Sequence, residues 1–324
     1  MARRDHRAST ALRAGGCAAI ALLLWIVACT GDVDFEIRRG RAPRPELAGA
    51  AGHAATAQGE PAASTLAQDL ALLTWNIEWF QDPERGPVDD ARQFEAVLGV
   101  LAQARPSLAG LQEIAVPERL DELVDRLPGY ALVISGYEWP QQTALLYRTE
   151  EFQPVAAQTI AGLDDAGRPP LEVELTGRDG SALTVIVVHA KAGANMPSWE
   201  RRERFAVGLK QHLDARPTGR PVIVLGDFND GFARSIVAGQ SSPYARFLGA
   251  SGYVAPTAAL EGGPEPSTVW GDTVDHVLLS GDLAARVQSG TADVLRDELL
   301  ARTPSFFDEV SDHVPVVLRL GPAR

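Results

Sequence analysis

The stretch VIVLGDFNDGF, residues 222–232, decides the fold class because it joins a buried strand to a polar turn. Its four leading aliphatic residues predict a strand in the protein interior. Asp227 and Asn229 follow at the point where this strand must leave its sheet. We expect Gly226 to let the strand turn tightly, with Asp227 and Asn229 projecting to one side and Phe228 packing back.

Short apolar runs of the same kind recur along the chain from residue 70. They predict strands at 70–75, 107–112, 130–134, 143–148, 152–158, 171–176, 182–188, 221–225, 274–279, 286–294 and 314–320. Apolar residues at helical spacing predict helices over 89–104 and about 198–215. Many strands with few helices favour an α+β fold, a four-layer α/β/β/α sandwich of two mostly antiparallel sheets flanked by helices.

The composition is that of a globular protein with an acidic surface. The chain has 324 residues, of which 45% are hydrophobic and 22% charged, and its net charge is -12. The first 28 residues hold four arginines against one aspartate, or +3, so the remainder carries -15. Proteins that grip long phosphate backbones use many Lys and Arg residues, so this balance argues against an extended nucleic-acid surface.

The N-terminus predicts a targeting segment. A basic start precedes the apolar run CAAIALLLWIVAC, residues 17–29, which indicates a signal peptide over 1–28. The ending IVAC resembles the lipobox of bacterial lipoproteins, which implies a lipid on Cys29; the alternative is an ordinary secretory signal with an incidental cysteine. Residues 29–67 are rich in Ala, Gly and Pro and predict a flexible tether, which leaves 68–324 as the catalytic domain.

Polar residues follow or open the predicted strands in six separate segments. They are Asn76 and Glu78, Glu113, His189 and Lys191, Asp227 and Asn229, Asp275, and Asp312 and His313. Any one of them is explained by an Asx-turn or a solvated strand end. Together they predict one rim of the sandwich, because carboxylates gathered there would repel one another without a cation.

The residue types in this set suit phosphoester hydrolysis. Asn76, Glu113 and Asp312 offer oxygen ligands that Mg²⁺ prefers, with Mn²⁺ or Ca²⁺ as alternatives, and there is no thiolate cluster for zinc. Hydrolysis requires charge neutralisation at phosphorus, a positioned water and protonation of the leaving oxygen. The acids, amides and histidines of the six segments can supply all three.

In chain order, WNIE, LQE, the His of VVHAK, GDFND, VDH and SDHVP resemble the motifs of the endonuclease/exonuclease/phosphatase superfamily. The resemblance spans about residues 70–320. The superfamily includes deoxyribonuclease I-like nucleases, abasic-site endonucleases, neutral sphingomyelinases and inositol polyphosphate phosphatases. His189 stands where abasic-site endonucleases typically have tyrosine, which points away from that repair branch.

The resemblance implies a metal site and two neighbouring candidates. Asn76 and Glu113 would bind the catalytic metal, with Asp312 as a further ligand. Glu78 stands where some members have Asp and is an additional metal candidate. Lys191 is either a positive charge for substrate phosphate or an ordinary surface lysine.

The resemblance also implies the catalytic roles. Asp227 would orient or deprotonate the attacking water, and Asn229 would bind the scissile phosphate. His189 and His313 would contact the phosphate and stabilise or protonate the transition state. Asp275 would orient His313 by accepting its other ring proton.

These observations predict a metal-dependent phosphoester hydrolase, foremost a phosphodiesterase of the nuclease type, lipid-anchored at the cell envelope. The alternatives are a sphingomyelinase-like or inositol-phosphate-type phosphoesterase and, from another class, a catalytically inactive envelope binding protein. The expected partner is nucleic acid, a phosphorylated small molecule or a lipid, with membrane contact through the N-terminal lipid only and a monomeric chain. Aromatic residues near the motifs either stack on a flat ligand or pack in loops; they are Trp79, Phe80, Trp139, Trp199 and Trp270.

Overall fold

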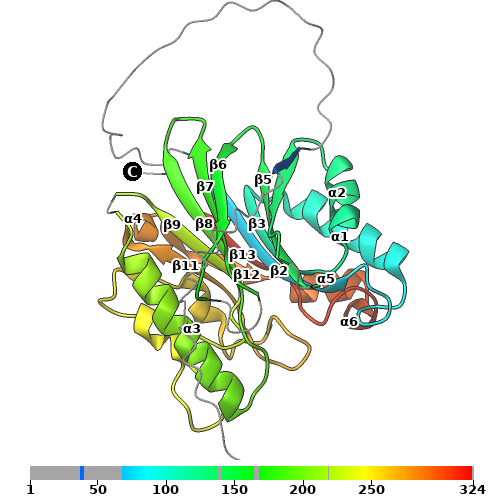
Figure 1. Cartoon of the computed structure of the whole chain (residues 1–324). Coiled ribbons are helices and arrows are strands. Elements are labelled where there is room, and N and C mark those ends of the chain that lie inside the picture. The colour runs from blue at the N-terminus through cyan, green and yellow to red at the C-terminus, as the bar shows by residue number, and fades with distance from the viewer. Residues whose placement is uncertain (1–36, 40–67, 138–139, 164–167, 218, 323–324) are drawn as a thin grey trace, which may run out of the picture. The chain divides into compact units, whose positions relative to one another are not determined.

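The computed structural model describes residues 37–39, 68–137, 140–163, 168–217 and 219–322 (Figure 1). The predicted signal peptide, Cys29, Trp139 and most of the predicted tether lie outside the described residues. Three tether residues are described, and they form the short strand β1 (Ile37–Arg39), which pairs with β4. None of the helices in the described ranges is both long and apolar enough to cross a bilayer.

Two sheets form the centre of the fold. The first has seven strands in the order β1, β4 (Tyr130–Ile134), β5 (Gln142–Arg148), β3 (Leu108–Ile114), β2 (Leu70–Phe80), β13 (Val316–Leu320) and β12 (Val287–Val294). The second has six, in the order β10 (Tyr253–Val254), β11 (Asp275–Ser280), β9 (Val222–Asp227), β8 (Ala182–His189), β7 (Leu171–Gly177) and β6 (Phe152–Thr159). All neighbours are antiparallel except β2 with β3 and β8 with β9.

Helices cover the outer face of each sheet (Figure 1). The first sheet packs against α1 (Asp90–Ala104), α2 (Pro117–Asp125), α5 (Arg296–Arg302) and α6 (Phe306–Glu309). The second packs against α3 (Met196–Asp214) and the 3-10 turns η1 (Pro243–Phe247) and η2 (Pro256–Leu260), and α4 (Gly281–Ala284) follows β11. A third apolar cluster, including Leu72, Val185 and Leu225, fills the space between the sheets. The predicted four-layer sandwich is confirmed, although the short helices α2, α4, α5 and α6 were not predicted.

The two parallel pairs carry polar residues to one end of the sandwich. Parallel strands end at the same edge, so neighbouring strand ends present their side chains together. In β8 and β9, His189 lies opposite Asp227, and the antiparallel β11 starts with Asp275 opposite the same Asp227. In β2 and β3, Asn76 lies opposite Gln112, one residue before Glu113.

Gly226 is required for its backbone conformation and also for a close contact that was not predicted. Its φ of 153° lies in a range that residues with a side chain rarely adopt. A Cβ at this position would lie 2.1 Å from the carbonyl oxygen of Val188 on the neighbouring strand β8. The glycine therefore permits close approach of two strands, and the turn itself comes later, at Asn229 with φ 52°. Phe228 packs back as expected, with its ring 5.0 Å from Phe232 and 5.1 Å from Tyr244.

A buried charge network fixes the C-terminal end of α3 to the second sheet. Glu172 on β7 is 2% exposed and accepts hydrogen bonds from Gln158 (3.0 Å) and Arg216 (2.9 Å). His212 Nε2 on α3 lies 2.5 Å from Glu172 Oε2. Burial alone would raise the pKa of Glu172, but these hydrogen bonds and the Arg216 charge lower it below its usual value.

Replacing Glu172 by Gln should lower the free energy of unfolding by about 1.5–3 kcal/mol at neutral pH, because its hydrogen bonds lose their charge. A carboxylate with a lowered folded-state pKa stabilises fully above its unfolded pKa of about 4.3, and this stabilisation disappears as pH falls through the folded-state value. The deficit measured by urea unfolding should therefore shrink below about pH 4.

The matched control is Glu174→Gln on the same strand, which removes a partly exposed ion pair with Arg220 (2.9 Å). Such pairs contribute about 0–1 kcal/mol, so this variant should unfold almost like the parent. Equal losses for the two variants would contradict the account of Glu172.

Candidate active site

A cavity of about 400 Å³ opens where the ends of the two sheets meet. Seven of the residues predicted from the sequence line it: Asn76, Glu113, His189, Asp227, Asn229, Asp312 and His313. Asp275 lies behind them and contacts His313. The structure thus brings together residues from all six segments, although these segments are spread over more than two hundred positions of the chain.

Asn76 connects the two sheets at this cavity. Its Nδ2 donates hydrogen bonds to Glu113 Oε1 on the first sheet and to Asp227 Oδ2 on the second, each at 3.2 Å. Its Oδ1 accepts from the backbone N–H of Glu78 at 3.0 Å. Asn76 is 2% exposed, so its amide holds two carboxylates at a fixed separation inside the protein.

Carboxylates crowd the side of the cavity next to the first sheet. Glu78 and Trp79 adopt left-handed backbone conformations, with φ 39° and 44°, and Glu113 does the same with φ 61°. Glu78 Oε2 accepts from the backbone N–H of Asp312 at 2.8 Å, and Glu113 Oε2 accepts from Trp79 N at 3.1 Å. Burial, and then repulsion from Asp312, raises the pKa of Glu78 to about 7.

This donor set fits a divalent cation. Asn76, Glu113 and Asp312 contribute only oxygen ligands, which suit Mg²⁺, Mn²⁺ or Ca²⁺. Burial also raises the pKa of Asp312. The charge of His313 lowers this pKa, whereas the charge of Glu113 raises it further. Negative groups are thus held together at a cost that a cation would relieve. Glu78 lies beside this group through its contact with Asp312 and does not line the cavity itself.

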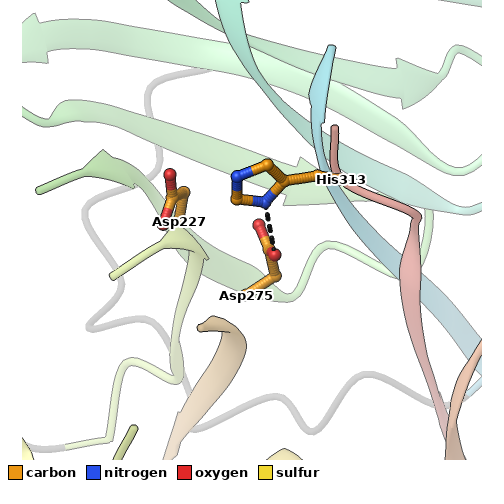
Figure 2. A group of neighbouring side chains, drawn as sticks. All are labelled: Asp227, Asp275 and His313. Atoms are coloured by element: carbon orange, nitrogen blue, oxygen red, sulfur yellow. Dashed lines mark hydrogen bonds and ion pairs between the residues drawn. The ribbon is translucent and has the colours of Figure 1, made fainter. Parts of the chain in front are cut away.

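Asp275 and His313 form a buried acid–imidazole pair (Figure 2). His313 Nδ1 lies 2.8 Å from Asp275 Oδ2, which also accepts a hydrogen bond from Ser267 Oγ at 2.7 Å. Burial alone would lower the pKa of His313, but the charge of Asp275 and this hydrogen bond raise it well above its usual value. His313 is therefore an imidazolium at neutral pH, with its Nδ1 held by the carboxylate.

Asp227 lies between this pair and Asn76. Its Oδ1 accepts from Asn229 N at 2.8 Å, and its Oδ2 accepts from Asn229 Nδ2 at 2.8 Å. Burial raises its pKa to about 7, although the nearby His313 charge acts in the opposite direction. Asn229 Nδ2 also donates to Ala190 O at 3.2 Å, so in this structure its amide orients Asp227.

His189 faces two carboxylates with one ring nitrogen. Its Nε2 is 3.5 Å from both Glu113 Oε1 and Asp227 Oδ2. Its side chain is 1% exposed, and burial, followed by the charge of Arg168, lowers its pKa well below the usual value. His189 is therefore neutral at pH 7 and differs in charge from His313.

Asp227, Asp275 and His313 also satisfy the geometry of a three-ligand metal site, because one donor atom from each lies within 4.8 Å of the others (Figure 2). His313 Nδ1 and Asp275 Oδ2 are paired with each other at 2.8 Å, which supports the acid–imidazole interpretation of this group. The oxygen ligands around Glu113 are the other candidate position for a cation.

Three basic residues, Arg168, Lys191 and Arg201, line a second, small cavity that His189 also lines. Lys191 does not line the main cavity. Arg168 donates to Gln141 Oε1 at 2.6 Å and to Ala190 O at 3.1 Å. Sequence reasoning missed Arg168 because no motif surrounds it. It also missed Ser267, which has no sequence signal apart from lying eight residues before Asp275.

Comparison with known proteins bears on this arrangement. The model of the Endonuclease/Exonuclease/phosphatase family matches residues 73–313. The chain belongs to this family. The resemblance stated from the ordered motifs is thereby confirmed, and the family groups phosphoester hydrolases. A search of curated proteins finds no match.

Solved structures of low sequence identity share the endonuclease/exonuclease/phosphatase fold. The human Nocturnin catalytic domain with bound sulfate has 21% identity and a TM-score of 0.58, covering 80% of this chain and 97% of that one. TDP2 from D. rerio, complexed with single strand DNA product, has 18% identity and a TM-score of 0.59, covering 78% and 98%. A family member from Bacteroides vulgatus has 14% identity and a TM-score of 0.58, covering 79% and 100%. At these identities the likeness supports the fold.

Millimolar Mg²⁺ should raise the melting temperature by about 5 °C, because the carboxylates form a cation site only in the folded chain. Glu113→Gln should reduce this shift to about 1 °C or less, since it removes one charge from that site. Thermal scans with and without Mg²⁺ measure both values. Glu118→Gln, an exposed position on α2, is the control and should keep the full shift. A shift that Glu113→Gln leaves intact would place the cation elsewhere.

Proposed function

We propose that this protein is a metal-dependent phosphodiesterase of the nuclease type that acts as a monomer at the cell envelope, anchored through a lipid on Cys29. The observation that carries the catalytic part is the junction at Asn76, which holds carboxylates of both sheets beside the His313 imidazolium. The sequence pattern ending at Cys29 supports the location. Mg²⁺ is the proposed metal because the ligands are hard oxygens.

Asn76, Glu113 and Asp312 would hold the metal at the crowded acidic side of the cavity. When bound, the cation supplies charge neutralisation and Lewis-acid polarisation at the phosphate. The chain's own groups do the rest. Asn76 Nδ2 fixes Glu113 relative to Asp227, and Asn76 Oδ1 would be its ligand atom for the metal, so the proposed cation ligands and the acid–base groups are held at one spacing.

Asp227 is the proposed general base. Its pKa of about 7 lies near physiological pH, where a group takes up and releases a proton most effectively. Asn229 orients this carboxylate through both of its oxygens. The predicted phosphate contact of Asn229 would replace its hydrogen bond to Ala190 O.

His313 and His189 complement each other in charge. The His313 imidazolium can stabilise negative charge on a phosphate oxygen and give up a proton from Nε2, while Asp275 holds its Nδ1–H. Neutral His189 would contribute a hydrogen bond through Nε2, the nitrogen that faces the cavity carboxylates. An inactive binding protein would be expected to lack one of these partners, and here every position is filled.

Two similar structures support phosphoester chemistry on this fold. Nocturnin was solved with a sulfate anion and D. rerio TDP2 with a single strand DNA product. The sphingomyelinase-like and inositol-phosphate-type alternatives use the same core chemistry and differ in what surrounds the phosphate. A panel of duplex DNA, single-stranded DNA, RNA, sphingomyelin and inositol phosphates separates them.

The purified chain should hydrolyse bis(p-nitrophenyl) phosphate in the presence of Mg²⁺ and lose this activity in EDTA, because the phosphate charge would no longer be neutralised. His313→Ala should reduce turnover by about 10²-fold or more, since it removes the imidazolium. Release of p-nitrophenol measures both effects.

His212→Ala is the matched histidine control. His212 lies on α3 against Glu172, so its loss should reduce stability while turnover stays within about twofold. Full activity in EDTA, or an unchanged rate for His313→Ala, would refute the proposed chemistry.

A further inference from the structure

One large aromatic side chain lines the active-site cavity and is exposed to solvent. In the described part of the chain, the large hydrophobic residues exposed to solvent are Val88, Val155, Met196, Val269 and Trp270, and of these five Trp270 lines the cavity. Trp270 is 69% exposed, which is costly for so large an apolar side chain. Aromatic side chains that line a cavity are typical of ligand-binding sites.

The loop that carries Trp270 is held rigidly. Thr268 Oγ1 donates to Asp272 O at 2.9 Å and accepts from Asp272 N at 3.2 Å, which closes a turn around the tryptophan. Arg296 Nη1 donates to Thr268 O at 2.9 Å, and Val269 N donates to Asp312 O at 2.9 Å. These hydrogen bonds hold the backbone on both sides of Trp270, so the loop would not have to become ordered when a ligand binds the indole.

The position of the indole connects it with the reacting centre. Its ring centroid is 6.0 Å from that of His313, and the two ring planes are 83° apart. The lining of the cavity also includes the small or aliphatic residues Ala192, Gly193, Ala194 and Ile236. No Lys or Arg is among the described residues that line this cavity. The space beside His313 therefore suits a flat uncharged group better than a second phosphate.

We propose that Trp270 forms a subsite for a planar aromatic ring joined closely to the scissile phosphate. The substrate class is then a short phosphodiester with such a ring, as in a nucleotide, rather than a long polynucleotide or a membrane lipid. The proposal rests on the proposed phosphodiesterase function. Its energetic basis is stacking of the ring on the indole, with further apolar contact from the small and aliphatic residues that line the cavity.

The test compares two ligands that differ only in the ring. Adenosine 5′-monophosphate and ribose 5-phosphate are titrated calorimetrically into the full chain with Mg²⁺ present. The monophosphate with the ring should bind about tenfold more tightly, because stacking on an aromatic side chain contributes that much. Trp270→Ala should bring the two affinities within about twofold by weakening the adenosine ligand alone, and Trp270→Phe should keep most of the preference.

Trp199→Ala is the matched control, because Trp199 donates to Ser241 O at 2.9 Å and does not line the cavity. It should leave the preference intact. Equal affinities for the two ligands in the parent chain, binding of neither ligand, or an unchanged preference in Trp270→Ala would overturn the subsite.

The alternative role for Trp270 is contact with a membrane surface, and a second experiment tests it. Co-sedimentation with sphingomyelin and phosphatidylcholine vesicles, in a Cys29→Ser background that removes any lipid on that residue, should be the same with and without Trp270→Ala. Loss of vesicle binding in Trp270→Ala would contradict the aromatic subsite. A chain that prefers adenosine 5′-monophosphate yet hydrolyses no phosphodiester would keep the subsite and refute the catalytic proposal.

Discussion

The structure depends on one buried amide that joins two acidic sheet ends. Asn76 donates to Glu113 and Asp227, which come from different sheets, and both hydrogen bonds are 3.2 Å long. The parallel pairs β2–β3 and β8–β9 bring these strand ends to one edge, and packing between the sheets brings the two edges together. Without the amide, the two buried carboxylates would lose the hydrogen-bond donor that they share, and the loss of such a donor is unfavourable in the protein interior.

From this junction the site divides into two halves of different chemistry. The side near the first sheet gathers Glu113, Asp312 and Glu78, which accumulate negative charge. The side near the second sheet holds Asp227 and the Asp275–His313 pair, and the pKa values of Asp227 and His313 are raised, that of Asp227 to about 7. In the proposed mechanism the first half would hold the cation and the second would exchange protons, which are two parts of phosphoester hydrolysis.

The sequence predicted most of this arrangement because its signals are local. Aliphatic runs located the long strands, and a polar residue directly after each run marked the rim, as with His189 and Asp227. The short helix α2 was missed although its buried residues Leu120, Leu123 and Val124 follow helical spacing, because the pattern extends over only nine residues. Arg168 was missed because its partners, Gln141 and Ala190, lie more than twenty positions away. Gly226 was assigned to a turn because the approach of β8 is a tertiary contact.

The central claim is that residues of both sheets share one cation and one phosphate. Anomalous diffraction from crystals grown with Mn²⁺ and inorganic phosphate tests it most directly. The account predicts an anomalous peak in contact with Glu113 and Asn76, with a phosphate between that peak and His313. A peak bound away from these residues, or a phosphate that reaches neither His313 nor Asp227, would contradict it.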